Sequence, residues 1–361
     1  MSIVIIAEAG VNHNGELELA LKLIDAAVEA GADIIKFQTS NPAVSVTSKA
    51  PKADYQLSNT SKRETQLEML NKLSLSKRDH HKLLSYSKEH GIEFLSTPFY
   101  LEGIEFLVYK LRLNRLKIGS GEIVNAPLLM KAAQCNVPII LSTGMCTLED
   151  IERALGVLAF GYMNKNSPSE VSFRKSFEST EGKKLLELNV TLLQCTTEYP
   201  TPYDDVNLLA MDTLARAFQL PVGLSDHTIG LEVAVAAVAR GAKIIEKHLT
   251  LDKNLSGPDH RASLEPKEFH SMVSAIRNVE KSLGKEVKVP SSSELSTSKI
   301  VRKSLVAGKS IEKGEKFSKE NVAVKRPGEG LSPFYYWDLL GKISDRDYKV
   351  DDNLVRTFIN K

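Results

Sequence analysis

The chain has 361 residues, of which 42% are hydrophobic and 25% are charged, the balance of an ordinary globular protein. Its formal net charge of +2, with lysines scattered among acids, argues against a nucleic-acid-binding protein, which usually carries a basic patch. Cys135, Cys146 and Cys195 cannot all pair, and none has a C-x-x-C spacing, so we expect reduced thiols in a cytoplasmic protein. The first apolar run, residues 3–6, is too short to span a bilayer.

Short apolar runs recur along the chain, and a helix-like stretch follows each of them. Residues 17–30 are one such helix, because Leu23, Ala26 and Ala30 share one face. Eight strands that alternate with helices predict a parallel (β/α)8 barrel. A doubly wound sheet is the alternative, but no glycine-rich turn follows the first strand. The predicted strands span residues 3–9, 33–39, 93–99, 115–121, 138–144, 190–197, 221–227 and 242–250.

Two connections between the predicted strands are long. We expect residues 40–75 to form an extended loop over one end of the barrel. Residues 161–187 are polar and charged, and we expect them to form an inserted helical excursion. Neither segment carries an obvious catalytic constellation.

The composition changes after the last predicted barrel helix, which places the barrel at residues 1–286. Residues 287–302 include the run Val-Pro-Ser-Ser-Ser and are predicted to be a linker. Residues 303–361, with strand-like runs at 303–307 and 321–326, are predicted to form a small β-rich domain. A domain of about 60 residues has a marginal core, so we expect it to rest on the barrel or on a second chain.

Polar side chains recur where the predicted strands end. Side chains of a strand alternate between two faces, and the catalytic groups of a barrel gather at the carboxyl ends of its strands. A polar residue where a strand meets solvent would explain any single case, but the recurrence predicts a real site at the mouth of the barrel. The four faces are Val4, Ile6 and Glu8; Ile34, Lys36 and Gln38; Gly223, Ser225 and His227; and Ile244, Glu246 and His248.

Two of these residues, His227 and His248, come from neighbouring strands and could meet at the rim of the barrel. Neutral imidazoles with oxygen ligands suit a divalent transition metal with open positions, and two ordinary hydrogen-bonded histidines are the alternative. Cys195 has no histidine near it in the sequence, so we interpret it as a small buried hydrophobe. Cationic and hydroxyl side chains at the same rim suit a phosphate or carboxylate ligand, and they are Lys36, Lys117, Ser120, Ser142 and Ser225.

The segments that carry these residues resemble the motifs of the sialic acid synthase family, which includes N-acetylneuraminate synthases and N,N′-diacetyllegionaminate synthases. The resemblance runs in order through essentially the whole chain. From residue 303 onward, including VKRPG at residues 324–328, the chain resembles the antifreeze-like SAF (β-clip) domain of that family. The barrel motifs are AEAGVNHNG (residues 7–15), KFQT (36–39), STPF (96–99), KIGSGE (117–122), LSTGM (141–145), CTTEYPTP (195–202), SDHT (225–228), EKH (246–248) and GPDH (257–260).

The resemblance implies a phosphoenolpyruvate-dependent transferase that forms a carbon–carbon bond. Phosphoenolpyruvate, an open-chain N-acylated mannosamine-type sugar and water would give a nine-carbon 2-keto acid and phosphate. The first expectation is an N-acetylneuraminate synthase. The alternative is an N,N′-diacetyllegionaminate synthase that uses 2,4-diacetamido-2,4,6-trideoxymannose, towards which Ala9-Gly10-Val11 and residues 336–341 lean.

Three other functions stay open as rivals. The SAF-like tail argues against a related condensing enzyme that makes a seven- or eight-carbon acid. A metal hydrolase normally needs three or more protein ligands, and only two candidates stand out. A non-catalytic carbohydrate-binding protein has no need for Lys36, Lys117 and the two histidines at strand ends.

The resemblance also implies a role for individual residues. His227 and His248 would hold a divalent metal, manganese in the first place and magnesium or cobalt as alternatives. The tail would cap the barrel of the partner chain in a domain-swapped homodimer. Thr197 stands where some members have asparagine, and Gln194 stands where a histidine is common. The implied catalytic residues are Glu8, Lys36, Lys117 and Glu122, and the implied substrate-binding residues are Gln38, Thr97, Ser120, Ser142, Thr197, Tyr199, Ser225, Asp259 and Arg326.

Overall fold

The computed structural model describes residues 2–61 and 63–355, and the chain divides into two compact units. The first unit ends at Gly284 and the second begins at Lys285. Residues 1, 62 and 356–361, which the predicted domains include, lie outside the described part. None of the described helices is long and apolar enough to cross a membrane.

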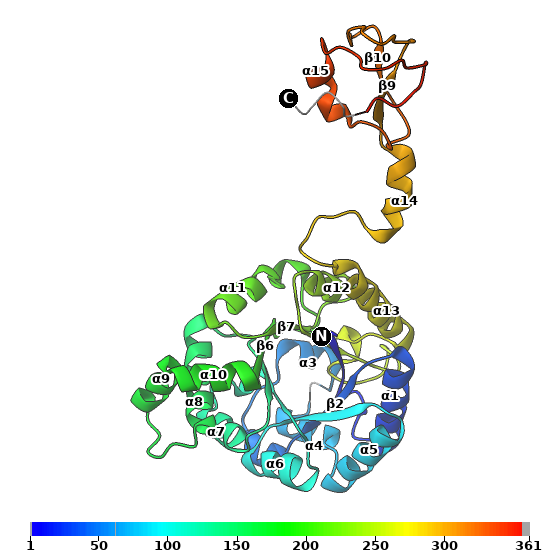
Figure 1. Ribbon diagram of the computed structural model, residues 1–361. Coiled ribbons are helices and arrows are strands. Elements are labelled where there is room, and N and C mark those ends of the chain that lie inside the picture. Colours follow the sequence, from blue (N-terminus) through cyan, green and yellow to red (C-terminus); the bar gives the residue numbers. More distant parts are fainter. Residues whose placement is uncertain (1, 62, 356–361) are drawn as a thin grey trace. The chain divides into compact units, whose positions relative to one another are not determined.

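The first unit is a ring of eight parallel strands inside a layer of helices (Figure 1). β1 pairs with β2 on one side and with β8 on the other, and β3 and β4 lie side by side where the ring closes. The predicted (β/α)8 barrel is therefore confirmed. Its strands are β1 (Val4–Gly10), β2 (Ile34–Thr39), β3 (Glu93–Pro98), β4 (Leu116–Ile118), β5 (Ile139–Ser142), β6 (Val190–Cys195), β7 (Val222–Asp226) and β8 (Ile244–His248).

The helices around the ring begin and end at local signals. The helix α1 (Leu17–Ala30) buries its apolar stripe and stops at Gly31, whose φ of 81° is left-handed. Thr147 caps α8 (Leu148–Tyr162) by accepting from the Asp150 backbone amide. The others are α5 (Lys77–Glu89), α6 (Leu101–Glu105) with the π turn Phe106–Lys110, α7 (Ala126–Gln134), α11 (Leu209–Phe218), α12 (Glu232–Ala239) and α13 (Pro266–Leu283).

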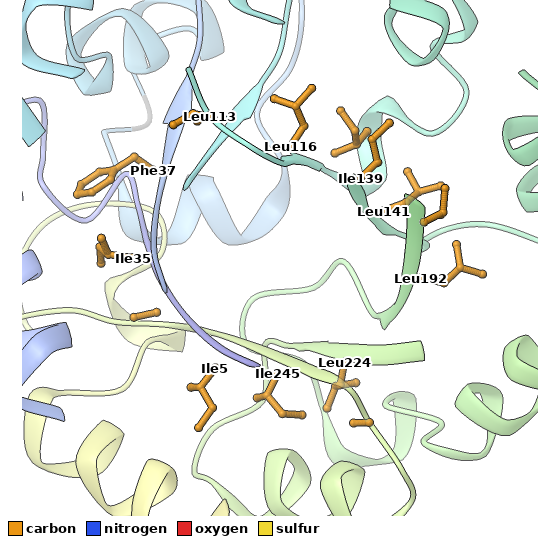
Figure 2. Close-up of a cluster of buried hydrophobic side chains, with 14 of the residues drawn as sticks. Ile5, Ile35, Phe37, Leu113, Leu116, Ile139, Leu141, Leu192, Leu224 and Ile245 are labelled. Atoms are coloured by element: carbon orange, nitrogen blue, oxygen red, sulfur yellow. The ribbon is translucent and has the colours of Figure 1, made fainter. Parts of the chain in front are cut away.

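Strand alternation divides the core into two layers. Side chains that point outward from the ring pack against the helices, among them Ile5, Ile35, Leu224 and Ile245 (Figure 2). The inward side chains form a separate small cluster, so the barrel is filled at this level. Its members are Ile6, Ile34, Leu95, Ile140, Leu193 and Ile244. Above this floor, the next inward positions are polar.

The segment from 40 to 75, predicted as an extended loop, contains three short helices, so that prediction was wrong about its local structure. They are α2 (Pro42–Ser45), α3 (Asp54–Asn59) and α4 (Gln66–Leu73). A capping box between Thr65 and Glu68 starts α4, a signal that was present in the sequence. The buried ammonium of Lys52 ties the segment together by donating to Thr60 Oγ1, Ser61 O and Glu64 Oε1.

Two other local predictions differ in outcome. The inserted helical excursion is confirmed, with α9 (Glu170–Glu178) and α10 (Thr180–Asn189). The predicted strand 115–121 ends at Ile118, because Gly119 leads into a 3-10 turn at Ser120–Glu122. Glycines on both sides of Ser120 favour this early stop. Further 3-10 turns lie at Tyr203–Asp205 and His260–Ala262.

The second unit begins with the predicted linker, most of which is helical. The helix α14 (Ser292–Val301) starts at a capping box in which Glu294 accepts from the Ser291 backbone amide. After it, β9 (Ser304–Ala307) and β10 (Val322–Lys325) form an antiparallel pair, as expected for a small β-rich domain. A 3-10 turn (Pro333–Tyr335) and α15 (Tyr336–Leu339) follow. Its core consists of Leu305, Ala307, Ile311, Phe317, Val322, Leu331, Leu339, Tyr348 and Leu354.

Replacing Gly223 tests how tightly the interior of the barrel is packed. A Cβ on this β7 residue would lie 2.3 Å from the Ile244 carbonyl oxygen and 2.8 Å from Leu193 Cδ2. We expect Gly223→Ala to cost about 1–3 kcal/mol by overpacking and to lower the melting temperature by about 3–10 °C. Gly121→Ala is the matched control, because a Cβ there would meet nothing within 4 Å. Equal melting temperatures of the two variants would contradict this packing argument.

Candidate active site

A cavity of about 340 Å³ opens at the carboxyl ends of the barrel strands. Every site residue predicted in the barrel lines it. A second cavity of about 380 Å³, among α7, α8 and α9, contains none of them. The predicted residues in the first cavity are Glu8, Lys36, Gln38, Thr97, Lys117, Ser120, Glu122, Ser142, Thr197, Tyr199, Ser225, His227, His248 and Asp259.

Two buried lysines stand at the floor of this cavity. Lys36 Nζ lies 2.5 Å from Glu8 Oε2 and donates to Thr97 Oγ1 at 3.2 Å. Lys117 Nζ donates to Ser142 Oγ at 2.8 Å. Because the lysines come from β2 and β4, the ring brings their charges to the same level.

Glu246, which the sequence places on an inward polar face but to which it assigns no role, lies between the two lysines. Its Oε1 is 3.7 Å from Lys36 Nζ and 3.4 Å from Lys117 Nζ, and it accepts from Ser225 Oγ at 3.1 Å. The signal was available, since Glu246 occupies the inward face of β8 between Ile244 and His248. What the sequence could not provide was its distance from either lysine.

The two carboxyl groups at this floor differ in their affinity for a proton. Burial raises the pKa of Glu8 from 4.5 to about 7, against the opposing effect of Lys36. Burial also disfavours the charge of Glu246, but Lys117 and Lys36 outweigh it and hold the pKa of that carboxyl below its usual value. One ionised carboxylate thus faces two lysines, which leaves positive charge for an anionic ligand. Glu8 is able to exchange a proton near neutral pH.

The two predicted metal ligands lie together at the rim, with ring centroids 5.4 Å apart. His227 Nδ1 donates to the Thr196 carbonyl oxygen at 2.7 Å, so in the neutral ring the Nε2 lone pair, 3.5 Å from Ser225 Oγ, is the one that could bind a metal. His248 Nδ1 is buried without a hydrogen-bond partner, 3.8 Å from Asp259 Oδ2. Within residues 2–61 and 63–355, no three His, Cys, Asp or Glu side chains gather as a metal site. The unpartnered His248 Nδ1 and the His227 ring are nitrogen donors of the kind that bind a divalent transition metal.

Cys195 is buried as expected, but it also lines the cavity. Its Sγ lies 3.9 Å from His227 Nδ1. The interpretation of a small buried hydrophobe therefore missed its place in the site. Cys195 ends β6 and His227 follows β7. The two residues are far apart in the sequence, so the sequence alone does not show that they are neighbours.

Aromatic rings form one side of the cavity. The Tyr199 ring lies over His227, with centroids 4.0 Å apart, and Tyr55 packs against Tyr199 at 4.9 Å. Tyr55 comes from α3 in the segment predicted as a loop, and it was not among the predicted site residues. The rings of the two pairs are tilted by 30° and 34°, respectively, and together they give this side of the cavity an apolar surface.

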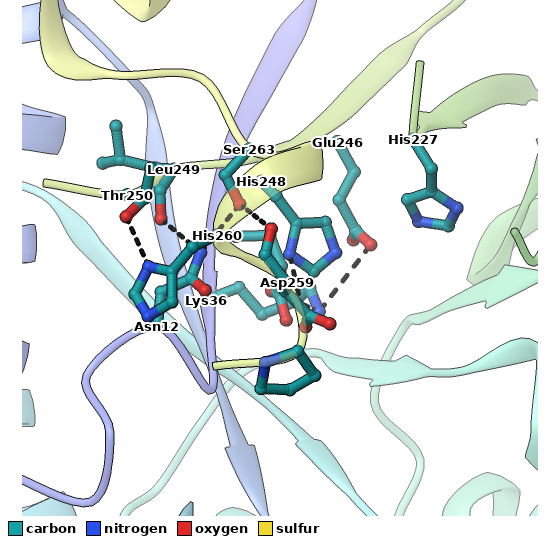
Figure 3. A network of polar contacts seen from close by, with 12 residues as sticks. Asn12, Lys36, His227, Glu246, His248, Leu249, Thr250, Asp259, His260 and Ser263 are labelled. Carbon is teal, nitrogen blue, oxygen red and sulfur yellow. Dashed lines mark hydrogen bonds and ion pairs between the residues drawn. The ribbon is translucent and has the colours of Figure 1, made fainter. Parts of the chain in front are cut away.

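Asp259 is held in the site by contacts between the loops after β1 and β8 (Figure 3). Ser263 Oγ donates to the Asp259 carbonyl oxygen at 2.7 Å and accepts from Asn12 Nδ2 at 2.8 Å. His260 Nδ1 lies 2.7 Å from Thr250 Oγ1. Burial raises the pKa of Asp259 to about 6. Asn12, from the motif at residues 7–15, thus supports Asp259 in the motif at residues 257–260.

The hydroxyls on the β4–β6 side depend on a glycine. Ser120 Oγ accepts from the Gly144 amide at 2.9 Å. A Cβ on Gly144 would lie 2.3 Å from Thr197 Oγ1, a buried hydroxyl that has no hydrogen-bond partner. Glu122 accepts from Asn125 Nδ2 at 2.7 Å. Arg326 follows β10 in the second unit, where it is exposed.

Comparisons with known proteins identify the family of this chain. The model of the NeuB family matches residues 23–288, and that of the SAF domain matches residues 302–349. An N,N′-diacetyllegionaminic acid synthase of Campylobacter jejuni is 50% identical over 352 residues, 98% of each chain. The Legionella pneumophila enzyme of the same name is 45% identical, over 94% of this chain and 90% of its own.

One solved structure supports the same conclusion. The N-acetylneuraminic acid synthetase of Leptospira borgpetersenii, in complex with citrate, superposes with a TM-score of 0.65 at 33% identity. The match covers 82% of this chain and 90% of that one. The chain therefore belongs to the NeuB family and carries a SAF domain after its barrel.

Proposed function

We propose that this enzyme condenses phosphoenolpyruvate with open-chain 2,4-diacetamido-2,4,6-trideoxymannose and water, giving N,N′-diacetyllegionaminic acid and phosphate. The two lysines beside two histidines at the mouth of the barrel carry the proposal. N-acetylmannosamine was the first expectation for the sugar. Identities of 50% and 45% to legionaminic acid synthases, against 33% to the neuraminic acid synthetase, favour the alternative.

The anionic substrate has a place at the floor of the cavity. Lys36 and Lys117 would hold the phosphate and carboxylate of phosphoenolpyruvate, with Thr97, Ser142 and Ser225 as further donors. Held in this way, phosphoenolpyruvate would present its enol carbon C3 to a sugar bound in the same cavity. Orientation of two reactants in this way is a large part of the catalysis of a condensation.

The histidines have a place beside the sugar aldehyde. Manganese, or magnesium or cobalt in its stead, would supply a Lewis acid there when bound by His227 and His248. Tyr199, Asp259 and Gln38 line the cavity around the same point and would orient the open-chain sugar. In the condensation, C3 of the enol attacks the aldehyde carbon, and positive charge develops at C2.

Glu8 would take up the proton of the attacking water. Its pKa of about 7 allows it to accept that proton as the oxygen adds to C2. The oxygen of the former aldehyde takes up one proton to become a hydroxyl. The bond between C2 and the phosphate oxygen then breaks, the C2 hydroxyl gives up its proton as the keto group forms, and Lys36 would stabilise the charge of the departing phosphate. We expect the enzyme to work in the cytoplasm, where phosphoenolpyruvate is available.

We further propose a homodimer in which the SAF domain of one chain caps the barrel of the other and brings Arg326 to the sugar. In the SAF domain, Phe334 and Trp337 are 91% and 75% exposed. On the barrel, Val124 and Met145, in the loops after β4 and β5, are 73% and 72% exposed. The proposed capping would remove these apolar side chains from water.

The choice of sugar is tested by coupling phosphate release to two acceptors. We expect kcat/KM for 2,4-diacetamido-2,4,6-trideoxymannose to exceed that for N-acetylmannosamine at least 10-fold, a difference of about 1.4 kcal/mol in transition-state binding. A higher kcat/KM for N-acetylmannosamine would instead indicate an N-acetylneuraminate synthase. No phosphate release with either sugar would reject the proposed condensation.

Substitution of the lysines tests the phosphoenolpyruvate site. Lys36→Met and Lys117→Met each remove a charge-assisted bond worth about 1.5–3 kcal/mol, so kcat/KM for phosphoenolpyruvate should fall about 10–150-fold. Lys22→Met, at an exposed position on α1, is the control and should behave as the parent. Parent-like saturation by both site variants would place the phosphate elsewhere.

The histidine variants test the metal. Chelator should abolish turnover of the parent, and added manganese should restore it. His227→Ala and His248→Ala should lose manganese binding, measured by electron paramagnetic resonance, while circular dichroism stays unchanged. His270→Ala, an exposed histidine on α13, should bind manganese as the parent does. Turnover by either site variant in excess chelator would contradict a metal role.

Mixing two inactive chains tests the exchange of SAF domains. An Arg326→Ala chain keeps an intact barrel, and a His248→Ala chain keeps an intact SAF domain. In an equal mixture, half of the dimers are mixed and each has one complete site, so about a quarter of the parent activity should return. Capping within one chain predicts no recovery. Mass spectrometry of the mixed dimers provides the control for assembly.

A further inference from the structure

A buried ion pair lies directly behind the two predicted metal ligands. Asp226 precedes His227 at the end of β7, and Lys247 precedes His248 at the end of β8. The two strands pair in register at these positions, Asp226 opposite Lys247. Because side chains alternate along a strand, the pair points away from the cavity while the histidines face it. Its neighbours on the same face, Leu224 and Ile245, belong to the hydrophobic core between barrel and helices.

The contacts of this pair enclose the backbone around His227. Lys247 Nζ donates to Asp226 Oδ2 at 2.8 Å, to the Thr228 carbonyl oxygen at 2.6 Å and to Thr228 Oγ1 at 3.4 Å. Asp226 Oδ1 accepts from the Thr228 amide at 2.9 Å and from its hydroxyl at 2.8 Å. The residues before and after His227 are thus both bound to one ammonium, which itself belongs to the residue before His248.

The energetics argue that this pair does more than stabilise the barrel. The side chains of Lys247 and Asp226 are 0% and 1% exposed, so both charges have lost their water. Well-packed apolar residues often replace a buried ion pair without loss of stability, so its presence is weak evidence for a stabilising role. Its particular contribution is geometric, because three directed hydrogen bonds fix two strand ends relative to each other.

We propose that Asp226, Lys247 and Thr228 are positioning residues that fix the separation and orientation of His227 and His248 for a divalent cation. The inference rests on the metal part of the proposed function. A metal site with only two protein ligands depends strongly on how those ligands are held, since no third ligand corrects their spacing. Loss of groups that orient metal ligands typically lowers metal affinity 10–100-fold.

The test is manganese binding by the full chain without substrates, measured by electron paramagnetic resonance. Asp226→Asn/Lys247→Met removes both charges together, so that no uncompensated charge stays buried. We expect this double variant to melt within a few degrees of the parent and to bind manganese 10–100-fold more weakly. Its KM for phosphoenolpyruvate should stay unchanged, because Lys36 and Lys117 are untouched, and saturating manganese should recover kcat.

A matched control removes another ion pair between neighbouring strands at the opposite end of the barrel. Arg115 Nε lies 2.8 Å from Glu93 Oε1, joining the residue before β4 to the start of β3. Glu93→Gln/Arg115→Met should leave manganese affinity unchanged. Equal weakening by this control would mean that any loosening of the ring affects the metal, and would overturn the positioning role.

A milder pair of variants decides the case if the double variant does not fold. Thr228→Val removes the hydroxyl that Asp226 and Lys247 share, and Thr228→Ser keeps it. The valine variant should bind manganese more weakly and the serine variant as the parent does. Parent-like affinity in the valine variant, or in a folded double variant, overturns the inference. Absence of manganese binding by the parent rejects it together with the metal part of the proposed function.

Discussion

Closure of eight parallel strands into a ring is the constraint on which the site depends. Each strand brings its last inward side chain to the same small space, whatever its distance along the sequence. An apolar floor that includes Ile6, Ile34 and Ile244 fills the ring below that level. The polar groups above it, including Lys36 and Glu246, are consequently both buried and close together.

The charged groups at the floor of the cavity are buried, so their charges must be balanced by one another. Lys36, Lys117 and Glu246 have each lost water. Glu246 and Glu8 raise the pKa of Lys36, and the two lysines lower the pKa of Glu246, but burial leaves the pKa of Lys117 below its usual value. Burial also raises the pKa of Glu8 to about 7. The floor of the cavity therefore combines positive charge for an anionic substrate with one carboxyl group that exchanges protons at neutral pH.

Side chains alternate along each strand, so the residues next to the ones that face the cavity point outward and can support them. In Ser225-Asp226-His227 and Glu246-Lys247-His248, the first and third residues line the cavity, and the middle ones form the ion pair behind it. On the far side, Asn12 supports Asp259 through Ser263. Each short motif thus contains both a functional side chain and a part of the structure that holds it.

The sequence by itself determined the barrel, its helix boundaries at Leu17 and Ala30, and which strand-end residues share a face, because periodicity and capping are local properties. Helices α4 and α14 also have local signals, because a capping box in the sequence marks the start of each. Only the tertiary structure decided that Glu246 lies between two lysines, that Tyr55 packs on Tyr199, and that Lys247 encloses His227. These are distances between segments remote in sequence, and they are set by how the ring closes and how its loops pack.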